Sequence, residues 1–202
     1  MSGFHALTGI MPPHEGAGDR LDWDEVARHW GTRFPGDYVD FVGTYGEGAI
    51  EDFLSIQIPL SRRFSHDQYG MAFETRNARG TWPAASASAA LADLAGTDLI
   101  AWGVDAAADI LCWKADDEDP DQWPVVVYER HGSPSWEKYA CGMTEFLVRT
   151  FTGDLPACPL SGTDLWRKER PRFLHWREED RLLAEGIDPW TGEPDPYAGM
   201  FD

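Results

Sequence analysis

Carboxylates are the side chains best able to do chemistry in this sequence, and one turn between Trp113 and Trp123 is crowded with them. Its five acidic residues are Asp116, Asp117, Glu118, Asp119 and Asp121. Like charges held in one loop repel each other unless a cationic partner arrives. An EF-hand is excluded because Pro120 interrupts the alternation of ligands and the central glycine is absent. The turn and, separately, the pair Asp105 and Asp109 could hold Ca²⁺ only weakly. Because the turn concentrates negative charge, we expect it to attract a basic protein.

Groups that could support catalysis are scattered along the chain. Ser65, His66 and Asp67 are adjacent, and neighbours in sequence point in different directions rather than forming a relay. Cys141 has no base near it in the sequence, which predicts a buried, inert thiol. The six histidines form no HxxxH or comparable ligand pair. We therefore predict no catalytic residue, no cofactor and no metal site. A hydrolase dependent on His66 or His131 is a minor alternative.

The overall charge narrows the classes of partner. The chain has 202 residues, 17 of them Lys or Arg and 35 Asp or Glu, and a net charge of -18. This charge would repel nucleic-acid phosphates and anionic membranes, so neither is an expected partner. It would steer a basic protein toward the chain, although it could also serve solubility alone. The three cysteines form no CxxC pair, and the sequence shows neither a signal peptide nor an apolar run of membrane length. We therefore expect a cytoplasmic protein.

Tryptophans beside the acidic turn are the second group of candidate contact residues. Trp102 and Trp123 adjoin loops, and a half-exposed tryptophan is a good interface anchor. The alternative is that the tryptophans in or beside strands simply fill the core. The predicted partner-binding set is thus the five carboxylates of the turn with Trp102 and Trp123.

Apolar periodicity predicts the elements that must position these side chains. Amphipathic helices are expected over residues 22–31 and 35–46, then strands at 49–58, 99–102, 109–113 and 122–128. An edge strand at 136–139 and a closing helix at 144–151 follow, with a further helix around 69–77 and a surface loop over 82–96. This order predicts the α+β class, with a central mixed, largely antiparallel sheet and helices packed on one side.

Composition divides the chain into three parts. Residues 1–19, rich in proline and glycine, are expected to be a flexible lead, and residues 20–155 form the α+β domain. Residues 156–202 hold a linker, an amphipathic helix over 171–185 outside the sheet, and an acidic tail. The tail aromatics Trp190, Tyr197 and Phe201 could contact another molecule, but we favour docking onto the body.

Several motifs occur in the order typical of one known family. They are the Trp23 helix, FPGDY at 34–38, YGEG at 45–48, LIAWG at 99–103, DILCW at 109–113, DPDQWPVVV at 119–127 and the pair Phe146 and Leu147. Over about residues 20–155 the chain resembles the SUKH superfamily, the Smi/Knr-like proteins of fungi and bacteria. Phe34 replaces the more usual leucine and leaves the turn chemistry intact.

The resemblance implies a mixed sheet with helices packed on one side and no known catalytic activity. Bacterial members are often immunity proteins that neutralise a secreted toxin, commonly a nuclease, and fungal members are regulatory scaffolds. The leading hypothesis is therefore a cytoplasmic immunity protein that binds a basic toxin domain. The alternative is an intracellular scaffold that recruits a non-toxin partner through the C-terminal extension. The sequence predicts no oligomeric state.

Overall fold

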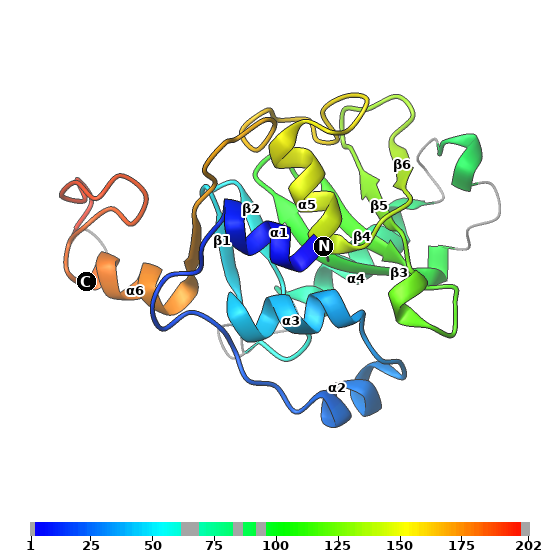
Figure 1. The fold of residues 1–202 in the computed structure, drawn as a ribbon, viewed down its shortest axis with the longest axis horizontal. Helices are drawn as coiled ribbons and strands as arrows, with labels where there is room; N and C mark the ends of the chain where they lie inside the picture. The colour runs from blue at the N-terminus through cyan, green and yellow to red at the C-terminus, as the bar shows by residue number, and fades with distance from the viewer. Residues whose placement is uncertain (1–2, 62–68, 83–86, 92–95, 199–202) are drawn as a thin grey trace.

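The structure is a computed structural model that describes residues 3–61, 69–82, 87–91 and 96–198. Its centre is a seven-stranded sheet with the strand order β6-β5-β4-β3-β2-β1-β7 (Figure 1). The strands are β1 (Gly48–Ile50), β2 (Leu54–Ile56), β3 (Leu99–Asp105), β4 (Ile110–Lys114), β5 (Val125–Tyr128), β6 (Trp136–Tyr139) and β7 (Phe173–His175). Every pairing between these strands is antiparallel. The α+β class is confirmed. The sheet was expected to be mixed and largely antiparallel; all of its strand pairs are antiparallel, and a parallel bridge joins Ala87 to Trp136 of β6.

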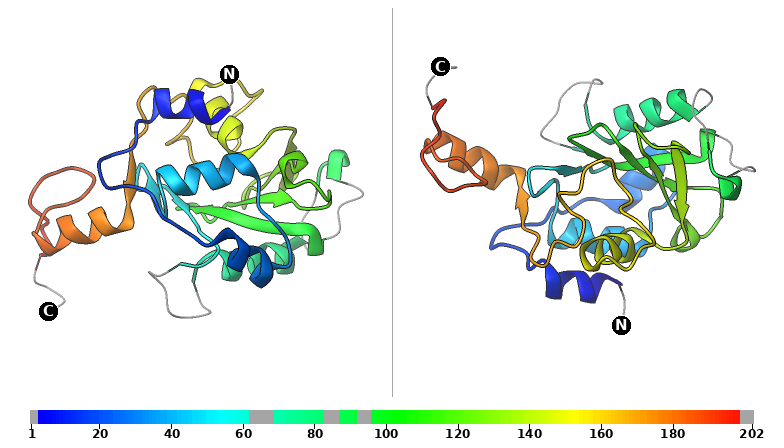
Figure 2. Two further views of the ribbon diagram at one scale, coloured as in Figure 1. Left: turned by 60° about the horizontal axis from the view of Figure 1, so that its bottom comes forward. Right: turned by 90° about the horizontal axis from the view of Figure 1, so that it is seen from above.

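Helices lie on both faces of the sheet (Figure 2). They are α1 (Gly3–Ile10), α2 (Trp23–Trp30), α3 (Gly36–Thr44), α4 (Met71–Thr81), α5 (Met143–Thr152) and α6 (Trp176–Ala184). Successive side chains of a strand point to opposite faces. Ile100 and Trp102 of β3 therefore join the core under α3 and α5, whereas Leu99 and Ala101 join a smaller core that includes Ala78 of α4. The sequence predicted that the helices pack on one side of the sheet, and α4 differs because it covers the opposite face.

The larger core is built from aromatic side chains around β4. The ring centroids of Tyr38 and Trp113 are 4.8 Å apart, and those of Trp102 and Trp113 are 6.1 Å apart. The Tyr38 hydroxyl donates to the carbonyl oxygen of Gln57 at 2.5 Å, which satisfies its buried polar end. This packing fixes β4, whose end leads directly into the acidic turn.

The strand expected over residues 49–58 is a hairpin in the structure. Strands β1 and β2 pair through Gly48 and Ile56, and Glu51 and Asp52 form the turn with φ values of 56° and 52°. Positive φ is uncommon outside glycine, so the residue types in this turn gave no signal of it. The hairpin doubles the chain back and leaves β1 free to pair with another strand.

The segment expected to be a flexible lead contains helix α1, which packs against α5 and α3. Leu7 and Met11 are fully buried, and Phe4 and Ile10 pack against the same core. These four apolar residues have helical spacing, and burying them stabilises a helix that its glycines alone would disfavour.

The extension after residue 156 is joined to the sheet. Residues 171–175, expected to begin a helix, include β7, which pairs with β1 and makes the sheet edge. Helix α6 follows directly and, with the residues after it, projects from that edge (Figures 1 and 2). Within the described part of the chain no helix has both the length and the apolarity to cross a membrane.

Candidate functional site

The acidic turn, residues 116–121, connects β4 to β5 and ends in the short helix η4 (Pro120–Gln122). All five of its acidic residues are exposed. Three of the aspartates also fold the turn. Asp117 accepts the backbone N–H of Asp119 at 2.9 Å, and Asp119 accepts that of Asp121 at 3.2 Å. Asp121 in turn accepts the N–H of Gly36 at 2.6 Å, which ties the turn to the start of α3.

The remaining two acidic residues have different surroundings. Asp116 forms an ion pair with Lys114. Glu118 makes no side-chain hydrogen bond or ion pair with any residue that the structure describes. Glu118 is thus the carboxylate of this turn whose charge faces solvent without a role in the fold.

Trp102 and Trp123 do not form the half-exposed anchors expected from the sequence. Trp102 has no exposed surface, because β3 continues to Asp105 and places it in the middle of a strand covered on both faces. Trp123 is 3% exposed, and its Nε1 donates to the carbonyl oxygen of Asp117 at 2.8 Å. The alternative of a core role is therefore correct for both, and Trp123 also closes the acidic turn from within.

Two open hollows adjoin the acidic turn and share Asp121, Trp123 and Glu145. One, of about 290 Å³, extends to Asp37 at the start of α3. The other, of about 410 Å³, extends along β6 to Lys138. Three carboxylates and one amine thus surround a concave surface next to the exposed charges of the turn.

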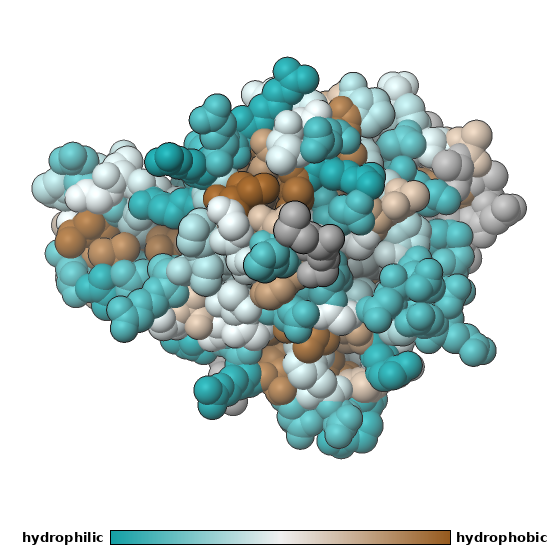
Figure 3. Space-filling view, in the orientation of Figure 1, coloured by the Kyte–Doolittle hydropathy of each residue, from teal (hydrophilic) through white to brown (hydrophobic). Residues whose placement is uncertain are grey.

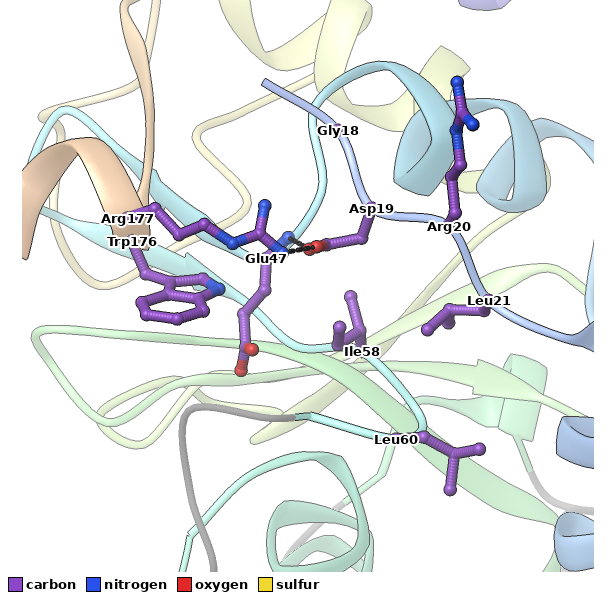
Figure 4. Close-up of a pocket in the computed structure, with 9 residues that line it drawn as sticks. All are labelled: Gly18, Asp19, Arg20, Leu21, Glu47, Ile58, Leu60, Trp176 and Arg177. Carbon is purple, nitrogen blue, oxygen red and sulfur yellow. Dashed lines mark hydrogen bonds and ion pairs between the residues drawn. The ribbon is translucent and has the colours of Figure 1, made fainter. Parts of the chain in front are cut away.

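A second cleft, which we call the junction cleft, lies where β7 passes into α6 and has a volume of about 370 Å³ (Figure 4). At its wall Asp19 accepts hydrogen bonds from Arg177 at 2.5 Å and from the backbone N–H of Glu47 at 2.9 Å. His175, fully buried, is 3.1 Å from the same carboxylate. Asp19 of the lead, Glu47 just before β1, and His175 and Arg177 of the extension therefore meet at one point, which no local sequence pattern could reveal.

The electrostatics of the junction cleft favour a structural role. Burial alone would raise the pKa of Asp19, but the hydrogen bonds from His175, Glu47 and Arg177 lower it to about 2. The Nδ1 atom of His175 accepts the N–H of Arg177 as an N-cap of α6, so Nε2 carries the hydrogen shared with Asp19. Both imidazole nitrogens are occupied. The histidine therefore joins the extension to the lead.

Among the described residues, the other groups considered for chemistry have structural surroundings. Asp109 accepts the backbone N–H groups of Arg130 and Ser161, and Asp105 accepts those of Ala107 and Asp109, so this pair braces loops. Burial raises the pKa of the Cys141 thiol to about 11. In the described residues no three His, Cys, Asp or Glu side chains gather as metal ligands. Ser65, His66 and Asp67 lie outside those residues.

A family model described as SMI1-KNR4 cell-wall, SUKH_6, matches residues 20–147, more than half of the chain. The match includes β1 to β6 and the acidic turn and ends within α5. It leaves β7 and α6 outside. Comparison with curated proteins gave no match, and neither did comparison with solved structures.

Proposed function

The chain belongs to the SMI1-KNR4 cell-wall family, and from this premise we propose that it is a non-enzymatic protein-binding module. We propose more narrowly that it is a cytoplasmic immunity protein, which binds a basic toxin domain and blocks its active surface by occupancy. The resemblance to bacterial members motivates the narrower proposal. Three free cysteines suit a reducing compartment.

The observation that carries the proposal is the acidic turn, an exposed concentration of carboxylates on a backbone that is attached to the frame. Asp121 accepts a hydrogen bond from the first residue of α3, and Trp123 is buried beneath the turn. The turn backbone is therefore already ordered, and little conformational entropy is lost when a partner binds. Fixed charges on a chain of net charge -18 would attract a cationic surface and raise its association rate. The hollows beside the turn then offer short-range contact.

The proposal is tested by capture and rescue. The full chain is immobilised and used to capture a partner from cells of its source, and the partner is then expressed alone and together with the chain. We expect a basic domain that stops growth alone and is tolerated when the chain is co-expressed. A captured partner that is harmless alone would contradict the immunity proposal and leave only the broader protein-binding function.

The second candidate function is an intracellular scaffold that recruits a non-toxin partner through the C-terminal extension. Its supporting observation is that Leu183 and Tyr197 of the extension are 45% and 62% exposed. Deleting residues 187–202 discriminates the two functions. The scaffold requires complete loss of partner binding without loss of thermal stability. The immunity proposal requires that the acidic turn still bind the partner, with affinity lowered at most by the contacts of the deleted segment.

A further inference from the structure

The C-terminal arm, residues 176–198, has an apolar surface that the other described residues leave uncovered. Helix α6 has no buried residue, and Leu183 on it is 45% exposed. The arm projects from the sheet edge, and in Figure 3 apolar atoms gather on it among hydrophilic ones. Exposed apolar surface bordered by polar residues is typical of interaction sites.

The apolar surface lies in a groove of about 350 Å³, which we call the C-terminal groove. Leu183 and Trp190 supply its apolar lining, and Asp52, Glu179, Asp188 and Asp195 supply carboxylates. No Lys, Arg or His is among the described residues that line it. Arg172 braces Trp190, with its guanidinium 5.1 Å from the ring centroid, and donates to the carbonyl oxygens of Pro189 and Trp190.

One carboxylate of the groove, that of Asp188, is held by backbone N–H groups, and its charge acts on a second, that of Asp52. Asp188 accepts the backbone N–H groups of Trp190 and Thr191 at 2.8 and 3.0 Å, and these bonds lower its pKa and keep it ionised. Burial, and then the charge of Asp188, raises the pKa of Asp52. A cation placed between the two carboxylates would relieve this repulsion.

We propose that the C-terminal groove binds a short basic segment of a partner protein. An apolar side chain of the segment contacts Leu183 and Trp190, and flanking Lys or Arg side chains pair with Asp52 and Asp188. The proposal rests on the protein-binding function and places a contact outside residues 20–147, the range matched by the family model. Charge complementarity selects the occupant, because four carboxylates around an apolar centre would repel an acidic segment.

The test measures binding of a fluorescein-labelled peptide, Arg-Lys-Leu-Lys-Arg, to the full chain by fluorescence anisotropy. We expect Asp52→Lys to raise Kd roughly fivefold and Leu183→Ser to raise it by a similar factor. Glu118→Lys, which reverses a charge on the acidic turn, is the control and should leave Kd within about twofold. If Asp52→Lys and Glu118→Lys weaken peptide binding equally, the peptide is attracted by net charge alone and the proposed groove site is wrong.

Two further readouts keep the proposal falsifiable. Replacing the peptide's leucine with serine should weaken binding to the wild-type chain but not to Leu183→Ser; equal weakening of both contradicts the apolar contact. If light scattering shows a dimer that Leu183→Ser dissociates, a second copy occupies the groove and the proposal is wrong. If the chain captures a partner but does not bind the peptide, the groove proposal is wrong while the proposed protein-binding function stands.

Discussion

At the scale of single residues, a charge in this protein acts according to its partners. Asp117, Asp119 and Asp121 each accept a backbone N–H, whereas Glu118 does not, although all are exposed. The sequence correctly predicted an exposed acidic turn but could not separate these roles, because capping depends on backbone positions. The sequence also predicted a half-exposed Trp102, which is fully buried, because proximity to a loop does not reveal how far a strand continues.

Asp105 gives a residue-scale prediction about pH. It is 6% exposed, and its Oδ2 atom has no hydrogen-bond partner in the described structure. Burial raises its pKa to about 6, so the folded state favours the neutral form and loses stability as pH rises from about 4 through 6. Asp105→Asn removes that charge and should stabilise the protein by about 2 kcal/mol at pH 8, with little effect at pH 4. Thermal unfolding at both pH values measures this.

Asp109→Asn serves as the matched control for Asp105→Asn. Asp109 accepts three hydrogen bonds from Arg130 and Ser161, so the same chemical change should destabilise the fold at pH 4. At pH 8 the loss should be smaller, because the change also removes a negative charge that raises the pKa of Asp105. The account of Asp105 would be wrong if its asparagine variant were no more stable than wild type at pH 8.

At the scale of elements, local patterns predicted those segments whose burial is one-sided and continuous. Helices α2, α3 and α5 and strands β3 to β6 lie where periodicity placed them. Strand β7 was missed because three residues, Phe173–His175, are too short for a period and adopt strand geometry only by pairing with β1. Helix α1 was missed because glycine and proline content outweighed its four apolar residues.

Phe173 tests whether the extension belongs to the cooperative fold. It is 2% exposed, and its ring centroid lies 5.4 Å from that of Tyr45 and 5.8 Å from that of Phe41. Phe173→Ala should lower the free energy of unfolding by about 3 kcal/mol. Leu183→Ala, on the exposed arm, should change it by about 0.5 kcal/mol or less. Urea unfolding followed by circular dichroism measures both, and an unchanged midpoint for Phe173→Ala would show that the extension folds apart from the sheet.

At the scale of the whole molecule, the sheet separates two candidate contact regions. The acidic turn lies between β4 and β5, toward the β6 end of the strand order, and the C-terminal groove lies beyond β7 at the other. The family match includes the first region and excludes the second. Composition predicted an acidic binding protein, but it could not locate the second region, which forms only when the hairpin turn at Asp52 meets residues from the arm.

The most direct measurement is the association rate of the captured partner with wild-type chain and with Glu118→Lys, across a range of salt concentrations. Glu118 has no structural partner in the described chain, so its reversal tests charge without disturbing the turn. Glu15→Lys, an exposed charge reversal outside both the acidic turn and the C-terminal groove, is the matched control. The account predicts association slowed roughly threefold or more by Glu118→Lys at low salt, converging with wild type as salt rises, with dissociation nearly unchanged. Equal association rates for Glu118→Lys and wild type at low salt would contradict it.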